Sequence, residues 1–238
     1  MRYPLDAVHV ACTLWPVGEM SSFDLFSAVE DVRAHTVSAL RARASLVVPT
    51  DEQEARLWLA LPRRALDGID TFTPPEGACL HASIGRPGAD LTGFRTSARQ
   101  AAQVKEILAT RFGRAGAKDA DPHCPVGPQW VRYDDVAPVA LMAGDMEAVR
   151  EFVAATLGDL AQAGTRHAIL RETLQNFLTH HRSYAAAAQA MNLHRNSIQY
   201  RVQRATALLP AAAKSLEDDF HVRAALLAAH WLGRSVLL

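Results

Sequence analysis

The stretch from residue 184 to residue 209 limits what this chain can fold into more sharply than any other part of the sequence. Apolar residues recur there at Ile198, Val202, Ala205 and Leu209, which is the spacing of one buried helix face. Asn192, a residue type that tolerates a left-handed turn, precedes them. The stretch therefore predicts a short helix, a tight turn and a longer second helix.

The first of these helices has small side chains where it would cross the second. Ala187, Ala188 and Met191 give it an apolar stripe. Ala188, Asn192 and Ile198 stand where a helix-turn-helix needs a small residue, a turn residue and a core aliphatic, because its two helices cross closely. We therefore interpret 184–209 as a helix-turn-helix.

The outward face of the second helix, about 194–208, carries side chains of the types that contact phosphates and base edges. We expect this helix to enter the major groove of double-stranded DNA. The residues expected on base edges are Arg195, Asn196, Gln199 and Tyr200, and those expected on phosphates are Ser197, Arg201 and Arg204. Two alternatives stay open. A polar helix face is often only solvated, and Arg201 or His194, which flank the apolar stripe, could instead pack against the core.

Charge is unevenly distributed along the chain, although 25 basic and 25 acidic residues make the net charge zero. Residues 165–210 hold six basic residues and one acidic residue, whereas residues 1–164 hold 16 basic and 21 acidic residues. A basic segment attached to an acidic body suits a protein whose C-terminal part contacts nucleic acid while its larger part has another task.

Composition excludes several classes of protein. With 238 residues and 49% hydrophobic content, the chain can form two folded domains. No apolar run approaches the roughly 20 residues that span a bilayer, and the first residues lack the layout of a signal peptide. Cys12, Cys79 and Cys124 are odd in number and widely spaced, and His123 beside Cys124 has no second ligand pair. We expect a cytoplasmic protein without membrane association, metal or other cofactor.

Strand and helix patterns alternate up to about residue 157 and predict an α+β domain over residues 1–160. The expected strands are 8–14, 46–48, 56–61, 79–85 and 130–133, and the expected helices are 23–43, 91–111, 138–142 and 145–157. A weak helix or loop is expected at 64–69 and a mobile loop at 113–128.

An all-α domain, residues 165–238, is expected after a seam at 158–164. The buried face of its leading helix is predicted as Leu170, Leu174, Phe177 and Leu178. The buried face of its last helix is predicted as Phe220, Ala224, Leu227 and Trp231.

Two motifs in this second domain resemble a known family. Leu170-Arg171-Glu172-Thr173-Leu174 and His194-Arg195-Asn196-Ser197-Ile198-Gln199-Tyr200-Arg201 are similar to the C-terminal DNA-binding domain of PucR/CdaR-type transcription regulators. The resemblance covers residues 168–233. It implies a sequence-specific DNA-binding regulator of a catabolic or metabolic operon, and it adds His194 to the expected DNA contacts. The second helix is also similar to that of Fis-type proteins, which bind as dimers.

The N-terminal part resembles the GGDEF-like middle domain of the same family. The residues that carry this likeness are Tyr3-Pro4-Leu5, Ser83-Ile84-Gly85 and Gly93-Phe94-Arg95. The resemblance implies a degenerate GGDEF-like, ferredoxin-like sheet with helices that serves as a regulatory or dimerisation unit. Full-length members usually carry another sensory domain ahead of this one.

The chief alternative function is nucleotide cyclisation in the N-terminal domain. A cyclase needs carboxylates for Mg²⁺ and a glycine-rich turn for the nucleotide. The corresponding hairpin, residues 49–55, contains Asp51, Glu52 and Glu54, but both glycines are missing. We therefore expect no enzymatic activity. Tyr133-Asp134-Asp135 could hold a metal, but a helix start or a loop is the simpler interpretation.

A further alternative is a cyclase-derived module that binds a nucleotide or another small molecule and acts through protein–protein contacts. Arg86, between Gly85 and Gly88, could hold an anion, although a plain loop is the simpler interpretation. A small-molecule effector is a possible partner, but the sequence does not indicate its site.

We expect a homodimer, because one helix-turn-helix contacts few phosphates and two-fold dimers bind two half-sites at once. The contact could lie in residues 1–160 or in helices 168–180 and 217–233. The apolar residues Phe177, Leu226, Leu227 and Trp231 of those helices could equally close the core of the domain.

Overall fold

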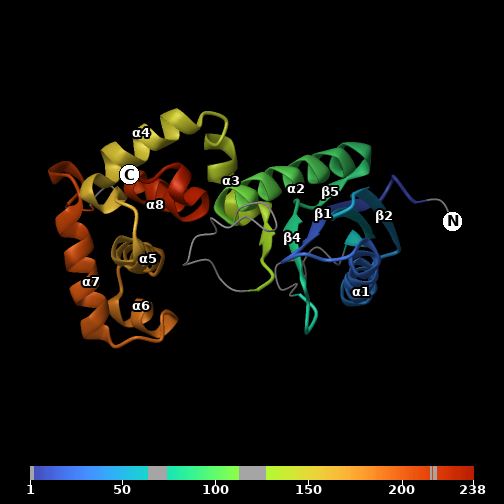
Figure 1. The fold of residues 1–238 in the computed structure, drawn as a ribbon, viewed down its shortest axis with the longest axis horizontal. Helices are drawn as coiled ribbons and strands as arrows, with labels where there is room; N and C mark the ends of the chain where they lie inside the picture. The colour runs from blue at the N-terminus through green and yellow to red at the C-terminus, as the bar shows by residue number, and fades with distance from the viewer. Residues whose placement is uncertain (1–2, 64–73, 113–126, 215, 217–218) are drawn as a thin grey trace. The chain divides into compact units, whose positions relative to one another are not determined.

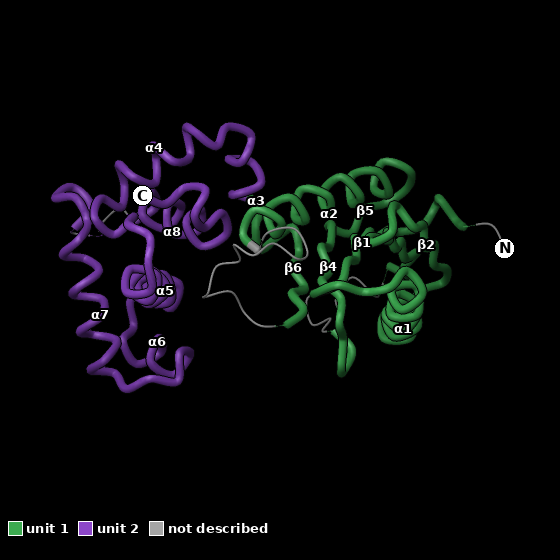
Figure 2. Tube along the Cα trace, viewed as in Figure 1, with its two compact units in different colours: residues 1–137 green, residues 138–238 purple. Residues whose placement is uncertain are grey.

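The computed structural model describes residues 3–63, 74–112, 127–214, 216 and 219–238. The chain forms two compact units, residues 1–137 and 138–238 (Figure 2). The loop or helix expected at 64–69 lies outside the described residues, as do His123, Cys124 and most of the loop expected at 113–128. A unit that mixes strands and helices, followed by a helical unit, confirms the predicted fold class.

Unit 1 is built on one sheet with a helix on each face (Figure 1). Its strands are β1 (Val8–Pro16), β2 (Ala44–Asp51), β3 (Glu54–Leu61), β4 (Leu80–Ile84), β5 (Gly88–Ala89) and β6 (Trp130–Arg132), and its helices are α1 (Ser22–Leu40) and α2 (Asp90–Phe112). The strand order is β2-β3-β1-β4-β6, with β5 paired to β1. β4 and β6 run parallel, and the other pairs are antiparallel. The order β2-β3-β1-β4 is that of the predicted ferredoxin-like sheet.

Alternation along the strands gives the sheet two different faces. Val10, Cys12 and Leu14 of β1 join Val29 of α1 in the hydrophobic core, because every second side chain points to the same face. α1 begins at Ser22, and the hydroxyl of its N-cap residue Ser21 accepts a hydrogen bond from the backbone N–H of Asp24 (3.1 Å). The α1 face is therefore the main apolar core of unit 1.

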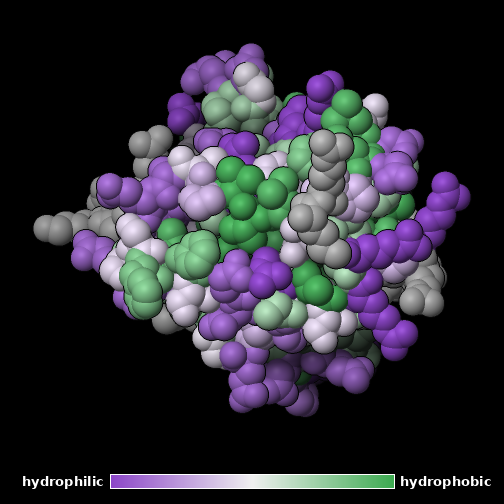
Figure 3. Space-filling view, turned by 90° about the vertical axis from the view of Figure 1, so that its right-hand side faces the viewer, coloured by the Kyte–Doolittle hydropathy of each residue, from purple (hydrophilic) through white to green (hydrophobic). Residues whose placement is uncertain are grey.

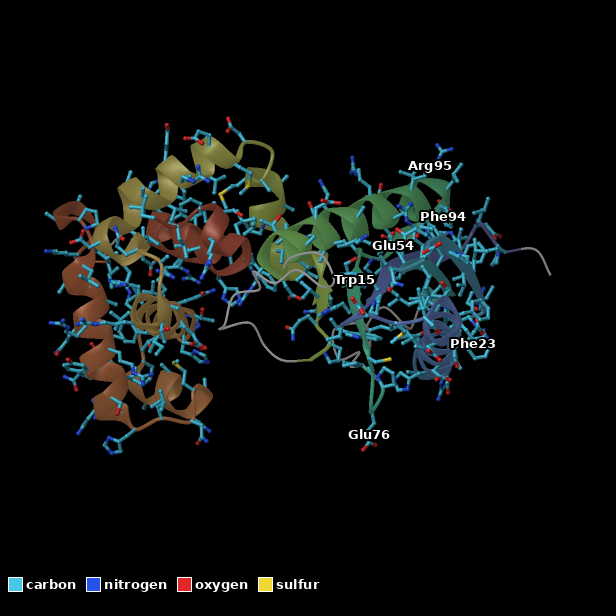
Figure 4. All side chains as sticks on the ribbon, in the orientation of Figure 1. Trp15, Phe23, Glu54, Glu76, Phe94 and Arg95 are labelled. Carbon is cyan, nitrogen blue, oxygen red and sulfur yellow. The ribbon has the colours of Figure 1, made fainter. Side chains whose placement is uncertain are left out.

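The face toward α2 is more aromatic and more polar. Phe94 of α2 stacks on Trp58 of β3 at 5.0 Å between ring centroids and meets His9 of β1 edge-on at 5.5 Å. Figure 4 shows Phe94 on the α2 side of the sheet. His9 is fully buried, and its ring nitrogens lie 3.0 Å from the hydroxyl of Tyr3 and 3.2 Å from the carbonyl of Leu5. Tyr3-Pro4-Leu5 and Gly93-Phe94-Arg95, two of the motifs that carry the GGDEF-like resemblance, thus take part in the packing of this unit.

Three glycines allow α2 to lie close against the sheet. A Cβ on Gly93 would lie 2.0 Å from the carbonyl carbon of Gly88, and a Cβ on Gly85 would lie 2.0 Å from the carbonyl oxygen of Ser97. The obstructing atoms are backbone atoms, so a side chain at these positions would force the elements apart. Ser97 also accepts a hydrogen bond from the N–H of Ala11 (2.9 Å), which ties α2 to β1.

Unit 2 consists of helices joined by short turns. α3 (Tyr133–Met142) begins in unit 1 and ends in unit 2. It is followed by α4 (Met146–Leu157), η2 (Gly158–Ala161), α5 (Thr165–Thr179), α6 (Tyr184–Ala190), α7 (Arg195–Leu208), η3 (Ala211–Ala213), α8 (Phe220–Leu232) and η4 (Gly233–Ser235), where η denotes a 3₁₀ turn. α4 packs on α8, and α5 contacts α6, α7 and α8.

The division between the units falls at Ala137 and Pro138, before the seam expected at 158–164. The reason is the packing of α4, which buries Val149, Val153 and Leu157 and contacts α8 of the helical unit. An amphipathic pattern predicts a helix with one buried face, but it does not say which element covers that face.

The buried face of α5 agrees with the sequence, whereas that of α8 does not. Leu170, Leu174, Phe177 and Leu178 are all buried, as predicted. The prediction for α8 was wrong, because the residues it buries are Val222, Ala225, Leu226, Ala228, Ala229 and Leu232. Phe220 is instead 70% exposed. α8 is apolar around most of its circumference, so its sequence is compatible with more than one buried face.

The described surface mixes apolar and hydrophilic side chains. Figure 3 shows one face, on which apolar side chains gather near the centre with hydrophilic ones around them. Phe23 and Phe26 of α1 are 82% and 55% exposed. Exposed apolar residues are common on folded proteins and do not by themselves define a partner site. None of the helices in the described ranges is long and apolar enough to cross a membrane.

We predict that Gly93→Ala lowers the free energy of unfolding of unit 1 by about 1–3 kcal/mol, because the added methyl group would overlap the backbone of Gly88. Urea unfolding followed by tryptophan fluorescence measures the change. Gly18→Ala is the matched control, since nothing lies within 4 Å of its Cβ position, and it should change stability by less than about 0.5 kcal/mol. Equal stability of the two variants would contradict the close approach of α2.

Candidate nucleic-acid interface

α6 and α7 form a helix-turn-helix whose turn has the predicted geometry. Ser183 caps α6, and its hydroxyl accepts a hydrogen bond from the N–H of Ala186 (3.2 Å). Asn192 has a φ of 51°, the left-handed conformation that its residue type tolerates. The N–H of Leu193 donates to the carbonyl of Ala188 (2.9 Å) and closes the turn. The chain is thereby redirected into α7 within four residues, 191–194.

The apolar stripe of α7 is buried, as its spacing predicted. Ile198 and Ala205 are fully buried, and Val202 is 4% exposed. Ala187 and Ala188 of α6 are also buried and present only methyl groups to the crossing. α7 packs on both α6 and α5. One face of α7 is thus held by the core, which leaves its opposite face to solvent.

The polar residues of α7 lie on that solvent-facing side. The exposed residues among those expected to contact DNA are Arg195, Asn196, Ser197, Gln199, Tyr200 and Arg204. Tyr200 is 63% exposed although it is aromatic. Arg201 is partly buried, at the border between the exposed face and the apolar stripe. The structure thus brings the predicted residues together on one helix face, and their contacts with DNA stay a prediction.

His194 has a structural role that its sequence motif did not reveal. It is the N-cap of α7, and its Nδ1 accepts a hydrogen bond from the N–H of Asn196 (3.2 Å). The first backbone N–H groups of a helix have no partner within the helix, so this contact stabilises its start. The ring is exposed, so its Nε2 edge stays available to a partner.

Two arginines that contributed to the predicted basic segment are structural. Arg171 is buried, and its Nη1 donates to the carbonyls of Leu160 (2.8 Å) and Gln162 (2.7 Å). Arg182 forms a salt bridge with Asp219 (3.2 Å) and donates to the carbonyl of Leu216. Neither contact could be inferred from the local sequence, because the partners of both arginines lie outside the helix or turn that carries the arginine.

The remaining positive charge is concentrated on α7. In the part of the chain that the structure describes, Arg195, Arg201 and Arg204 form no salt bridge with a protein carboxylate. Their guanidinium groups are therefore available to an external anion, and phosphate is the anion that arginine contacts with two parallel hydrogen bonds. This arrangement suits a nucleic acid whose backbone passes along α7.

The hairpin between β2 and β3 is the place where a cyclase would hold its metal. Strand pairing extends to Asp51 and Glu54, so the turn is tighter than the sequence suggested. Glu54 is almost buried and forms an ion pair with Lys105 of α2. Its carboxylate also accepts a hydrogen bond from the hydroxyl of Thr50 (3.0 Å) and lies 3.8 Å from Arg56. Figure 4 shows Glu54 on the same side of the sheet as Phe94.

Other candidate groups of unit 1 are occupied by internal contacts. Arg86 forms a salt bridge with Asp134 and lies over the ring of Tyr133, 5.3 Å from its centroid, so it is not an open anion site.

Burial raises the pKa of the Cys12 thiol to about 12, which keeps this cysteine protonated and unreactive at neutral pH. Burial lowers the pKa of His81, whose Nδ1 accepts from the N–H of Gln129 (3.0 Å). The described residues hold no cluster of three potential metal ligands.

Asp134 and Asp135 belong to the first turn of α3, which is the simpler of the two interpretations of that motif. Asp135 accepts a hydrogen bond from the N–H of Arg132 (3.1 Å). A sheet unit whose carboxylate Glu54 is paired with Lys105, followed by a helix-turn-helix with an exposed polar face, is the architecture of a two-unit helix-turn-helix protein.

Comparison with known families assigns both units. Residues 170–228 match the family model of the PucR C-terminal helix-turn-helix domain, and residues 1–107 match that of the GGDEF-like domain. The chain therefore carries a GGDEF-like domain and a PucR C-terminal helix-turn-helix domain. The resemblance to PucR/CdaR-type regulators is thereby confirmed in both of its domains.

The chain is also similar to individual proteins. It is 24% identical over 192 residues to the transcriptional activator PmfR of Paenarthrobacter nicotinovorans, a match that covers 80% of this chain and 36% of that protein. The chain thus spans about a third of the length of this curated relative. A crystal structure of a regulator of polyketide synthase expression from Bifidobacterium adolescentis is 17% identical, with a TM-score of 0.33 over 95% of this chain and 82% of that one.

We predict that His194→Ala destabilises unit 2 by about 0.5–2 kcal/mol, because α7 loses its N-cap. His194→Ser should restore most of this stability, since a serine hydroxyl caps equally well. Thermal unfolding of the two variants measures the difference. If both variants unfold at the wild-type temperature, the capping role of His194 is wrong.

Proposed function

We propose that this protein is a sequence-specific DNA-binding transcription regulator that controls a catabolic or metabolic operon. The observation that carries the proposal is the exposed face of α7, where polar side chains project from a helix-turn-helix together with arginines that pair with no described carboxylate. The family of the C-terminal domain supports it, as does the similarity of the chain to PmfR, a transcriptional activator. A protein with this task in a bacterium works in the cytoplasm, where the DNA lies.

The proposed contacts follow from the position of each residue along α7. Arg195, Asn196 and Gln199 project from its first two turns, the part of a recognition helix that reaches base edges, and Tyr200 and His194 lie beside them. The hydroxyl of Ser197 and the guanidinium groups of Arg201 and Arg204 are proposed to bind phosphates and to fix the register of the helix on DNA.

We predict that Arg195→Ala weakens binding to the cognate site by about 1–3 kcal/mol, because arginine contacts guanine with two hydrogen bonds. A site selected from random DNA is titrated at fixed salt with both proteins. Arg99→Ala, an exposed change in unit 1, is the matched control and should leave the affinity unchanged. Equal affinities of Arg195→Ala and the control would remove Arg195 from the base contacts.

We further propose that the protein binds DNA as a homodimer. A single DNA-binding module of this kind buries only roughly 600–1,000 Å², and a second copy adds a second half-site at high effective concentration. Phe177 and Leu226 are buried within unit 2, so these two candidates for the dimer contact serve its core, whereas Leu227 and Trp231 stay partly exposed.

We predict that the selected site is an inverted repeat with half-sites about 10 base pairs, or a multiple of that, apart. Sedimentation of the free protein and of its DNA complex gives the stoichiometry. Two protomers for each site are expected at saturation. One protomer bound to a site without internal symmetry would overturn the dimer proposal.

We also propose that the GGDEF-like domain is not a catalyst. The hairpin lacks the glycines that admit a nucleotide, and the carboxylate of Glu54 is already compensated by the ammonium group of Lys105. A cation held by the protein itself competes with the Mg²⁺ that a cyclase would need at this position.

Incubation of the full chain with GTP and Mg²⁺ is therefore expected to yield no cyclic dinucleotide. The product is measured by chromatography against a blank without protein. Product above the blank, lost when Asp51→Asn and Glu52→Gln are combined, would show that the hairpin is catalytic.

A further inference from the structure

Unit 2 contains a groove of about 760 Å³. Its walls are formed by the C-terminal end of α3 and by residues of α4, α5 and α8. Its apolar lining includes Leu141, Met142, Phe152, Phe220, Ala224 and Leu227. Leu141 and Phe220 are 78% and 70% exposed. A volume of several hundred Å³ with a mostly apolar lining is typical of sites for small molecules. The groove is also where α8 departs from its predicted orientation, since Phe220, Ala224 and Leu227 were expected to be core.

Among the described residues that line the groove, Arg223 is the arginine without a carboxylate partner. Asp219 and Arg223 both line it, but Asp219 already forms a salt bridge with Arg182 (3.2 Å). Arg223 is exposed, and within the described ranges it has no carboxylate partner. Gln175 and Thr179 of α5 add neutral polar groups to the same wall. In the described part of the chain, the lining therefore combines an apolar surface with one arginine, one histidine (His221) and the paired carboxylate of Asp219.

We propose that this groove binds a small amphipathic carboxylate. The apolar part of the ligand lies between α3 and α8, where it covers Leu141 and Phe220. The carboxylate pairs with the guanidinium of Arg223, a geometry that allows two parallel hydrogen bonds. Charge complementarity distinguishes this ligand from an uncharged one of the same size, because only the carboxylate neutralises Arg223.

The groove lies next to elements that hold the helix-turn-helix in place. Gln175 and Thr179 belong to α5, and α5 contacts α6 and α7. Asp219 in the groove wall is the partner of Arg182, which has a φ of 62° in the turn between α5 and α6. A ligand bound here therefore contacts both the helix that supports α7 and the salt bridge that stabilises the preceding turn.

Isothermal titration of the full chain with octanoate tests the proposal, and octan-1-ol is the uncharged counterpart. We expect saturable octanoate binding at one site for each chain, weaker binding of octan-1-ol, and about tenfold weaker octanoate binding by Arg223→Gln, equivalent to about 1.4 kcal/mol. Arg166→Gln, an exposed change on the same unit outside the groove lining, is the matched control and should bind like the wild type. Phe220→Ser should weaken both ligands.

Two results would overturn the proposal. They are the absence of saturable octanoate binding by the wild type, and equal octanoate affinity of Arg223→Gln and Arg166→Gln. If the wild type binds no octanoate and Phe220→Ser changes from dimer to monomer in sedimentation, the groove is assigned to a second copy of the chain. Octanoate binding is measured without DNA, so the test is independent of the proposed function.

Discussion

Burial of one stripe of α7 is the interaction on which the arrangement of unit 2 depends. Ile198, Val202 and Ala205 are almost completely removed from solvent between α5 and α6. Burying one large aliphatic side chain contributes about 1.5–3 kcal/mol, and the alanines of α6 let the helices approach closely enough to achieve it. A helix has 3.6 residues per turn, so placing this stripe in the core also determines which side chains face outward. The exposed polar face of α7 is a consequence of its packing.

Arginines in unit 2 have two different tasks, and burial separates them. Arg171 satisfies two backbone carbonyls from within the fold, and Arg182 joins the turn after α5 to the start of α8. Removing such a group would leave buried acceptors without partners, which is costly. Arg195 and Arg204 are exposed, and no carboxylate among the described residues forms a salt bridge with them. The chain is neutral as a whole, so the free positive charge of α7 is local, and its field acts on a partner only at short range in salt.

In unit 1, the alternation of side chains along the strands produces two different faces of the sheet. One is apolar, and on the other charged and aromatic side chains contact one another. Glu54 and Lys105 neutralise one another beside Trp15, whose ring lies 5.9 Å from the lysine nitrogen. The glycines at the start of α2 serve close packing of backbone on backbone. The polar groups of this GGDEF-like sheet thus make contacts within the unit, and a shared fold does not require a shared function.

The sequence by itself determined the class of each unit, the buried stripes of α5 and α7, and the left-handed turn at Asn192. Each of these features depends on residues that are close in the sequence, so the spacing of apolar and turn residues is enough to predict it. Only the tertiary structure decided that α4 belongs to the helical unit, that His194 caps α7, that Arg171 is structural, and which face of the apolar helix α8 is covered. These depend on which elements meet in space, and contacts between residues distant in the chain leave no periodic pattern in the sequence.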